Sequence, residues 1–197
     1  MFLELPPDDE ATAELYAADA ESDGYVMNLT RLWAWRPDVC TDFVDLRRAL
    51  VSRSTLSERE RAVIVCASVA TLGDSYCALA WGRNLADAAD AAIASAVLRG
   101  EDDARLTARE KALAEWSRKV VRSPNATVEA DVERLRAAGL ADREIFEATT
   151  LAAFRVAFST VNDALGARPD PALAQAAPAE VRAAISFGRP VDDAQPA

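Results

Sequence analysis

The residues best suited to chemistry are an aspartate and a cysteine three positions apart, Asp74 and Cys77. They follow Gly73, which interrupts an apolar stretch, so the spacing predicts that Asp74 caps a new helix whose first turn contains Cys77. The start of a helix favours a thiolate, whereas an ionised carboxylate beside it opposes one by like-charge repulsion. Two interpretations stay open. Either Asp74 is a cap and Cys77 a small buried residue, or both take part in a reaction, with Asp74 as acid or base.

The absence of histidine excludes several other kinds of active site. Neither a Ser-His-Asp triad nor a Cys-His pair can exist, and no imidazole can bind a metal ion. The acidic pairs Asp102-Asp103 and Asp192-Asp193 lie in expected loop and tail segments, so we interpret them as solvated carboxylates rather than metal ligands. The 7 glycines are scattered and form no phosphate-binding loop. We therefore predict neither a metal nor a cofactor.

The net charge limits the class of partner. The chain has 22 Lys and Arg against 32 Asp and Glu, a formal charge of −10, which argues against binding to the phosphates of nucleic acid. No apolar run approaches the roughly 20 residues of a membrane-spanning helix, and the N-terminus does not resemble a signal peptide. Three cysteines, Cys40, Cys66 and Cys77, cannot all pair with one another. We expect no membrane association, and a cytoplasmic protein with reduced thiols.

The sequence predicts an all-α protein. It is rich in Ala, Leu, Arg and Glu, which favour helices, and no window alternates apolar and polar residues as a half-buried strand would. We expect about eight to ten helices in a single domain over residues 1–170, with a core at 56–100, and then a Pro- and Ala-rich tail at 171–197. Asp142 is the expected cap of the last long helix, over 143–165, and a short helix at 181–187 is expected to dock on the rest.

Two of the expected helices begin with the same local pattern. Ser57-x-x-Glu60 and Thr107-x-x-Glu110 are capping boxes, in which a hydroxyl and a carboxylate satisfy the free amides of a helix start. The segments around them, 56–63 and 106–113, match each other and lie 50 residues apart. The match predicts a second helical unit over 106–166. The alternative, that any two capped amphipathic helices look alike, stays open.

Short motifs occur in an informative order along residues 10–170: Glu-Leu-Tyr at 14–16, Gly-Tyr-Val-Met-Asn-Leu at 24–29, Arg-Pro-Asp at 36–38, Leu-Ser-Glu-Arg-Glu-Arg at 56–61, Gly-Asp-Ser-Tyr-Cys at 73–77, Ala-Gly-Leu at 138–140 and Asn-Asp-Ala-Leu-Gly at 162–166. In this order the chain resembles the alkylhydroperoxidase-D-like (AhpD-like), carboxymuconolactone-decarboxylase superfamily, and more narrowly its peroxidase-related branch. The resemblance implies an all-α fold, an oxidoreductase ancestry and a homo-oligomer, which would be a trimer, dimer or hexamer.

The resemblance also implies a thiol relay, most of which this sequence lacks. In the superfamily a Cys-x-x-Cys motif begins a helix, a glutamate lies twelve residues before the first cysteine, and a histidine lies four residues after the second. Here Cys77 stands at the second cysteine, whereas the other positions hold Asp74, Ala62 and Trp81; Ala80 stands at the alternative histidine position. No disulfide can form within the motif. We therefore predict that disulfide-cycling peroxidase activity is absent or very weak.

Three functional hypotheses follow from this altered motif. In the first, the chain is an enzyme of small-molecule metabolism, with Asp74 and Cys77 as catalytic residues and with Tyr76 and Trp81 as walls of a pocket for an apolar or aromatic molecule. In the second, it is a non-enzymatic, oligomeric scaffold that binds a small ligand. In the third, Cys66 replaces the missing cysteine and forms a redox pair with Cys77 in a residual thiol peroxidase.

Arg155 is a further candidate, because it lies within the apolar segment 154–158. A buried cation requires a partner. We expect an ion pair within the subunit or across an interface, or alternatively a clamp for an anionic substrate.

Overall fold

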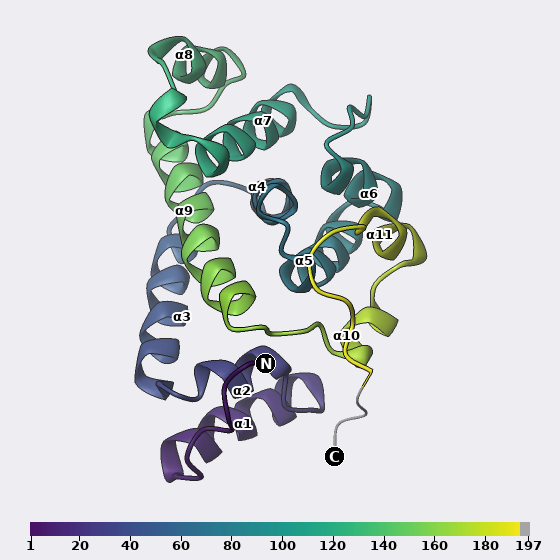
Figure 1. Cartoon of the computed structure of the whole chain (residues 1–197). Coiled ribbons are helices and arrows are strands. Elements are labelled where there is room, and N and C mark those ends of the chain that lie inside the picture. The colour runs from purple at the N-terminus through teal and green to yellow at the C-terminus, as the bar shows by residue number, and fades with distance from the viewer. Residues whose placement is uncertain (194–197) are drawn as a thin grey trace.

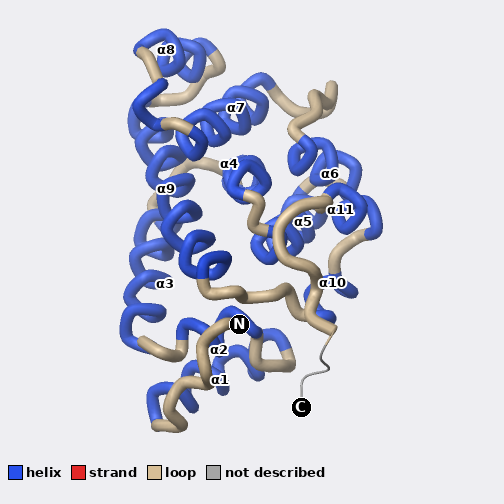
Figure 2. The backbone as a smooth tube through the Cα atoms, viewed as in Figure 1, coloured by secondary structure: helices blue, strands red, loops and turns tan. Residues whose placement is uncertain are grey.

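The computed structural model describes residues 1–193, and every regular element in that range is helical (Figures 1 and 2). This confirms the predicted all-α class. The helices are α1 (Glu10–Asp23), α2 (Asn28–Trp33), α3 (Pro37–Ser52), α4 (Glu58–Leu72), α5 (Ser75–Ala88), α6 (Ala91–Arg99), α7 (Ala108–Arg122), a 3-10 turn (Pro124–Ala126), α8 (Glu129–Ala137), α9 (Asp142–Ala164), α10 (Pro171–Ala176) and α11 (Ala179–Ala184).

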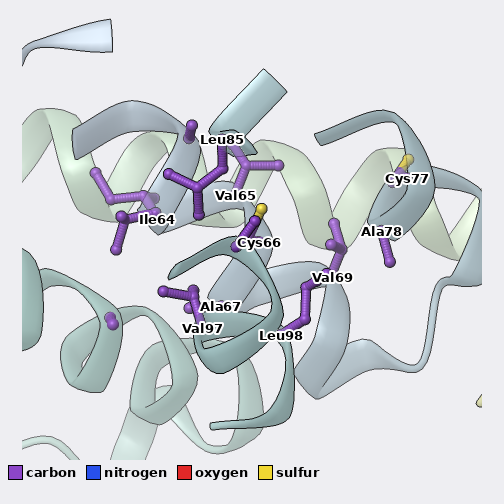
Figure 3. Close-up of a cluster of buried hydrophobic side chains, with 14 of the residues drawn as sticks. Ile64, Val65, Cys66, Ala67, Val69, Cys77, Ala78, Leu85, Val97 and Leu98 are labelled. Carbon is purple, nitrogen blue, oxygen red and sulfur yellow. The ribbon is translucent and has the colours of Figure 1, made fainter. Parts of the chain in front are cut away.

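Helix α4 forms the centre of the protein. In Figure 1 it is viewed end-on, with α7 and α9 on one side and α5 and α6 on the other. Residues 62–69 are all buried, which explains why this helix is apolar around its whole circumference. Figure 3 shows its side chains packed with those of Leu85 from α5 and Val97 from α6. The core therefore fixes the position of α5, the helix that carries Asp74 and Cys77 at its start.

Both predicted capping boxes are present, and they also bind each other. Each hydroxyl accepts the expected backbone N–H, and each glutamate accepts the N–H of its own cap residue. In addition, Arg59 of α4 pairs with Glu110 of α7 at 2.6 Å, and Arg109 of α7 pairs with Glu60 of α4 at 2.8 Å. The repeated sequence thus produces a reciprocal exchange of ion pairs between the two helices.

The predicted cap of α9 is wrong by one residue. Asp142 is itself the first helical residue, and Ala141 precedes it with an extended backbone. The Ala141 N–H donates to the Glu144 carboxylate at 2.8 Å, so Glu144 satisfies the helix start. The Asp142 carboxylate instead pairs with Arg136 at 2.7 Å.

The segment after residue 170 packs against α5 and α6. Val181 of α11 is fully buried, and a Cβ added to Gly82 of α5 would lie 2.5 Å from it, so glycine permits the close approach of the two helices. The chain then passes the start of α5, where the Ser75 hydroxyl donates to the Arg189 carbonyl at 2.7 Å. The docked helix expected at 181–187 corresponds to α11, which spans Ala179–Ala184. Residues 194–197 of the expected tail lie outside the described part of the chain.

Candidate functional site

Asp74 and Cys77 adopt the local geometry expected of a cap and a first-turn residue. The Asp74 carboxylate accepts the Cys77 backbone N–H at 2.9 Å through Oδ1, and its backbone is extended. Asp74 is 0% exposed and Cys77 is 3% exposed. The second carboxylate oxygen, Oδ2, is buried and has no hydrogen-bond partner among the described residues. An unpaired carboxylate oxygen in the interior is unusual, since burial of such a group costs free energy.

The environment of Cys77 disfavours its thiolate. Burial raises the pKa of this thiol well above its ordinary value, and the nearby Asp74 carboxylate raises it further, while Arg155 acts in the opposite direction. The sequence suggested a balance between the helix start and Asp74. The structure shows that burial decides the outcome, because a thiol at 3% exposure loses the water that would stabilise its anion. A neutral thiol is a poor nucleophile.

Arg155 is buried without a counter-ion. It is 4% exposed, its Nε has no hydrogen-bond partner, and its guanidinium forms no ion pair within residues 1–193. The expected ion pair within the subunit is therefore not found in the described chain. The guanidinium lies over the rings of Trp81 and Phe158, at 5.9 and 5.3 Å from their centroids. These aromatic faces stabilise the cation in part, and the Asp74 carboxylate, which forms no ion pair with it, also favours the charged form and opposes the lowering of its pKa by burial.

Other polar groups with unmet hydrogen-bonding capacity share the same face of α9. Ser159 and Asn162 follow Arg155 at positions four and seven, and both are buried. The Ser159 hydroxyl and the Asn162 amide nitrogen lack partners within the described residues, although the Asn162 carbonyl accepts the Trp33 indole N–H at 2.8 Å. In the next position, burial and the Asp74 carboxylate raise the pKa of Asp163 to about 6.

A cavity of about 300 Å³ is lined by Ala62 and Trp81, the two residues that the sequence resemblance assigns to the glutamate and histidine positions of the superfamily. Trp81 lies one turn after Cys77 on α5, so its ring connects the cavity to the buried Arg155. Neither Asp74 nor Cys77 lines this cavity. The remaining lining residues come from α3, α4, α5 and α9 and are Arg47, Arg48, Val51, Ser52, Glu58, Arg61, Asn84 and Leu151.

Tyr76 does not line this cavity. Its hydroxyl donates to the Asp170 carboxylate, and the ring is 2% exposed. Asp170 also accepts the backbone N–H of Asn28, at 3.0 Å. Tyr76 therefore joins α5 to Asp170, the residue before α10, and through Asp170 to Asn28 at the start of α2. It lies on a different side of α5 from Trp81.

The three cysteines are free thiols and all are buried. Figure 3 shows the Cys66 and Cys77 sulfurs apart from each other in the core. Burial also raises the pKa of Cys66. Within residues 1–193 no three His, Cys, Asp or Glu side chains are grouped as a metal site would require, and no helix is long and apolar enough to cross a membrane.

Comparison with solved structures places this geometry in a known fold. An uncharacterised peroxidase-related protein from Ralstonia eutropha JMP134, described as an alkylhydroperoxidase AhpD core, matches with a TM-score of 0.76 and 26% identity, over 88% of this chain and 93% of its own. A peroxidase-related protein from Silicibacter sp. TM1040 matches with a TM-score of 0.77 and 24% identity, over the same shares of the two chains. The chain has an AhpD-like fold.

A third structure with this fold contains a ligand. It is a cysteine-to-alanine variant of the debrominase Bmp8 in complex with 2,3,4-tribromopyrrole, with a TM-score of 0.73 and 13% identity over 89% of this chain and 96% of that one. No protein-family model matches the sequence, and no curated protein matches it. The AhpD-like resemblance inferred from the motifs thus rests on tertiary structure as well.

Sequence reasoning did not identify two arginines that line the cavity beside Trp81, Arg47 and Arg61. They belong to helices expected for other reasons, and neither forms an ion pair in the described chain. In the sequence, Arg47 is followed by Arg48, which is ordinary on an exposed helix face, and Arg61 ends the motif at 56–61. Their convergence depends on the packing of both α3 and α4 against α9.

Proposed function

We propose that this chain binds a small organic molecule in the cavity beside Trp81, and that it does so without cycling a disulfide. The observation that carries the proposal is the lining of the cavity by Ala62 and Trp81, which stand where the superfamily has a glutamate and a histidine. A methyl group and an indole cannot transfer protons in the way that these residues do. They provide instead an apolar wall of the kind that ligand pockets use.

The state of the thiols supports the same proposal. Cys77 is buried, and its pKa is raised by burial and by Asp74, so little thiolate is available to attack a peroxide. A redox pair with Cys66 gains no support, because that thiol is also free, buried and raised in pKa. The debrominase complex offers a parallel for a small aromatic ligand within this fold.

The first test measures hydroperoxide consumption and thiol reactivity. With cumene hydroperoxide and dithiothreitol, we expect the purified protein to add nothing to the rate of the protein-free mixture. Cys77→Ser should give the same trace. The native thiols should react with a disulfide reagent far more slowly than in denaturant, because all three are buried. Repeated turnover that requires Cys77 would overturn the proposal.

The second test measures ligand binding as an upward shift in melting temperature with a panel of small aromatic compounds. We expect at least one compound to stabilise the protein, and Trp81→Ala to abolish that shift relative to the variant's own unliganded value. Trp35→Ala is the matched control, since Trp35 is exposed and does not line the cavity. A panel without any stabilising compound, or a shift that survives Trp81→Ala, would contradict the proposal.

Catalysis by Asp74 is a second candidate, which its Oδ2 favours because that atom has no hydrogen-bond partner among the described residues. Asp74 is buried and does not line the cavity, so its substrate would have to enter at the start of α5 instead. Asp74→Asn keeps an oxygen for the cap but removes the charge. An enzyme that uses Asp74 would lose turnover and retain binding, whereas a ligand-binding scaffold would show no change in either.

We also propose a homo-oligomer in the cytoplasm; the exposed apolar side chains of Leu46 on α3 and Phe146 on α9 support the oligomer.

A further inference from the structure

The cavity beside Trp81 has a charge opposite to that of the whole chain. Its lining contains three arginines, Arg47, Arg48 and Arg61, and a single carboxylate, that of Glu58. The lining charge is therefore positive, although the chain carries a net charge of −10. In an acidic protein, a concave site with an excess of cations concentrates anions locally.

Two of these cations have no anionic partner within the described chain. Arg48 pairs with Asp45 on the outer face of α3. Arg61 donates to the Leu56 carbonyl, which is a neutral acceptor, and forms no ion pair. Arg47 is half-buried and forms neither a hydrogen bond nor an ion pair among residues 1–193. Burial, followed by the neighbouring Arg48, lowers the pKa of Arg47, which means that its charged form is poorly solvated.

The rest of the cavity lining is apolar and favours an uncharged, hydrophobic part of a ligand. Val51, Ala62, Trp81 and Leu151 offer hydrocarbon and one large flat ring. A ring system can pack against the Trp81 indole, and the cavity volume of about 300 Å³ is at the lower end of the range of about 300 to 1,000 Å³ for ligand pockets. The ligand that satisfies both parts of the cavity is compact, flat, apolar and negatively charged at one end.

We propose that the cavity binds a small aromatic carboxylate, with the carboxylate at Arg47 and Arg61 and the ring against Trp81. This inference rests on the proposed function and specifies its ligand class. Arg47 provides the charge-assisted hydrogen bonds that fix the anionic end, because its guanidinium has no competing partner in the described chain. Glu58 repels a second negative charge, so a monoanion is preferred to a dianion.

The test compares an acid with its neutral amide of the same shape. Calorimetric titration of the purified full chain with 2-naphthoate at pH 7.5 should show binding, and 2-naphthamide should bind at least tenfold more weakly. Arg47→Gln should weaken the binding of 2-naphthoate at least tenfold and leave that of 2-naphthamide unchanged. Arg53→Gln is the matched control, since it removes the same charge just beyond the end of α3 but does not line the cavity. We expect it to change binding less than twofold.

Each outcome separates this inference from the proposed function. Equal binding of the acid and the amide, both lost in Trp81→Ala, would overturn the preference for an anion and leave the small-molecule site intact. Equal weakening by Arg47→Gln and Arg53→Gln would also overturn the inference, because it would indicate long-range attraction rather than contact with Arg47. No binding of 2-naphthoate at 5 mM would overturn it as well. Failure of the proposed function itself would appear as an aromatic panel in which nothing stabilises the protein.

Discussion

Replacement of Arg155 by methionine should make this protein more stable. Arg155 is a buried cation with no ion pair within residues 1–193, and burial lowers its pKa. Methionine keeps an unbranched side chain of similar length in the same space and has no charge to desolvate. Most substitutions of buried residues destabilise a protein, so a gain here is a specific consequence of the missing partner.

The magnitude follows from the contacts of the guanidinium. Burial of one ion costs several kcal/mol after relaxation of the protein. The rings of Trp81 and Phe158 return about 0.5 to 2 kcal/mol each, and at 5.9 and 5.3 Å from their centroids the lower half of that range applies. A net gain of about 1 to 3 kcal/mol in the free energy of unfolding remains for Arg155→Met. At roughly 2 to 4 °C per kcal/mol for a chain of this size, the melting temperature should rise by about 3 to 10 °C.

Urea denaturation at several pH values measures this gain. Arginine is charged in both the folded and the unfolded state well below its folded pKa, so the penalty is complete at neutral pH and is relieved only as the pH rises through that value. The gain should therefore be constant from pH 6 to pH 9. Arg143→Met is the matched control on the same helix, because Arg143 is exposed and pairs with Glu147 at 2.8 Å. Its loss leaves the buried Glu147 carboxylate without this ion pair, so Arg143→Met should destabilise the protein.

Two results would refute the reasoning. A loss of stability of 1 kcal/mol or more in Arg155→Met, repeated in Arg155→Leu, would mean that the guanidinium is satisfied in solution. A gain of equal size in Arg143→Met would mean that removal of any charge from α9 stabilises the chain.

Three further predictions concern the surroundings of the site. Asp163→Asn should raise the free energy of unfolding above pH 6. The pKa of Asp163 is raised to about 6 in the folded protein, so protonated Asp163 stabilises the folded state at low pH, and this contribution is lost as the pH rises through that value. Denaturation between pH 4 and pH 8 measures the difference between the variant and the native chain. Arg59→Ala should lower the free energy of unfolding by about 1 to 3 kcal/mol, because it leaves the buried Glu110 carboxylate without its ion pair at 2.6 Å. Gly82→Ala should cost about 1 to 3 kcal/mol and expose the end of the chain to proteases, because the added methyl group meets Val181 of α11 at 2.5 Å.

The first two of these predictions have a control in the same element or the same kind of pair. Asp142→Asn serves for Asp163, since Asp142 lies on the same helix and its pKa is lowered rather than raised. Arg36→Ala serves for Arg59, since its pair with Asp38 is exposed. A flat pH profile in the difference between Asp163→Asn and the native chain, or an equal cost in Arg36→Ala, would contradict the corresponding argument. Unchanged proteolysis in Gly82→Ala would contradict the close packing of α11.

Much of the helical arrangement could be predicted from residues close together in the sequence. The capping boxes at Ser57 and Thr107 require only residues three positions apart, and Gly73 ends α4 in the left-handed conformation that glycine adopts readily. The one-residue error at Asp142 arose because Glu144 accepts the Ala141 N–H at the start of the helix, while the Asp142 carboxylate pairs with Arg136. Local hydrogen bonds compete over such short distances that the sequence indicates the helix but not always its cap.

The site could be predicted only in part. Asp74 and Cys77 were found from their spacing, and their geometry is local. Tyr76 was expected to form a wall of the pocket. Its partner Asp170 lies 94 residues further along the chain, so the direction of the ring depends on how α10 packs. The pKa of Cys77 depends on burial, which a sequence motif does not specify.

The sequence by itself determined that chemistry requiring an imidazole is unavailable to these residues, because they include no histidine. It also determined the helical class, through periodicity and caps that act over three or four residues. Only the tertiary structure decided that Arg155 forms no ion pair within residues 1–193 and that Arg47 and Trp81 line one cavity. Charges find or lack partners through contacts between helices far apart in sequence, and these contacts exist only once the core around α4 has packed.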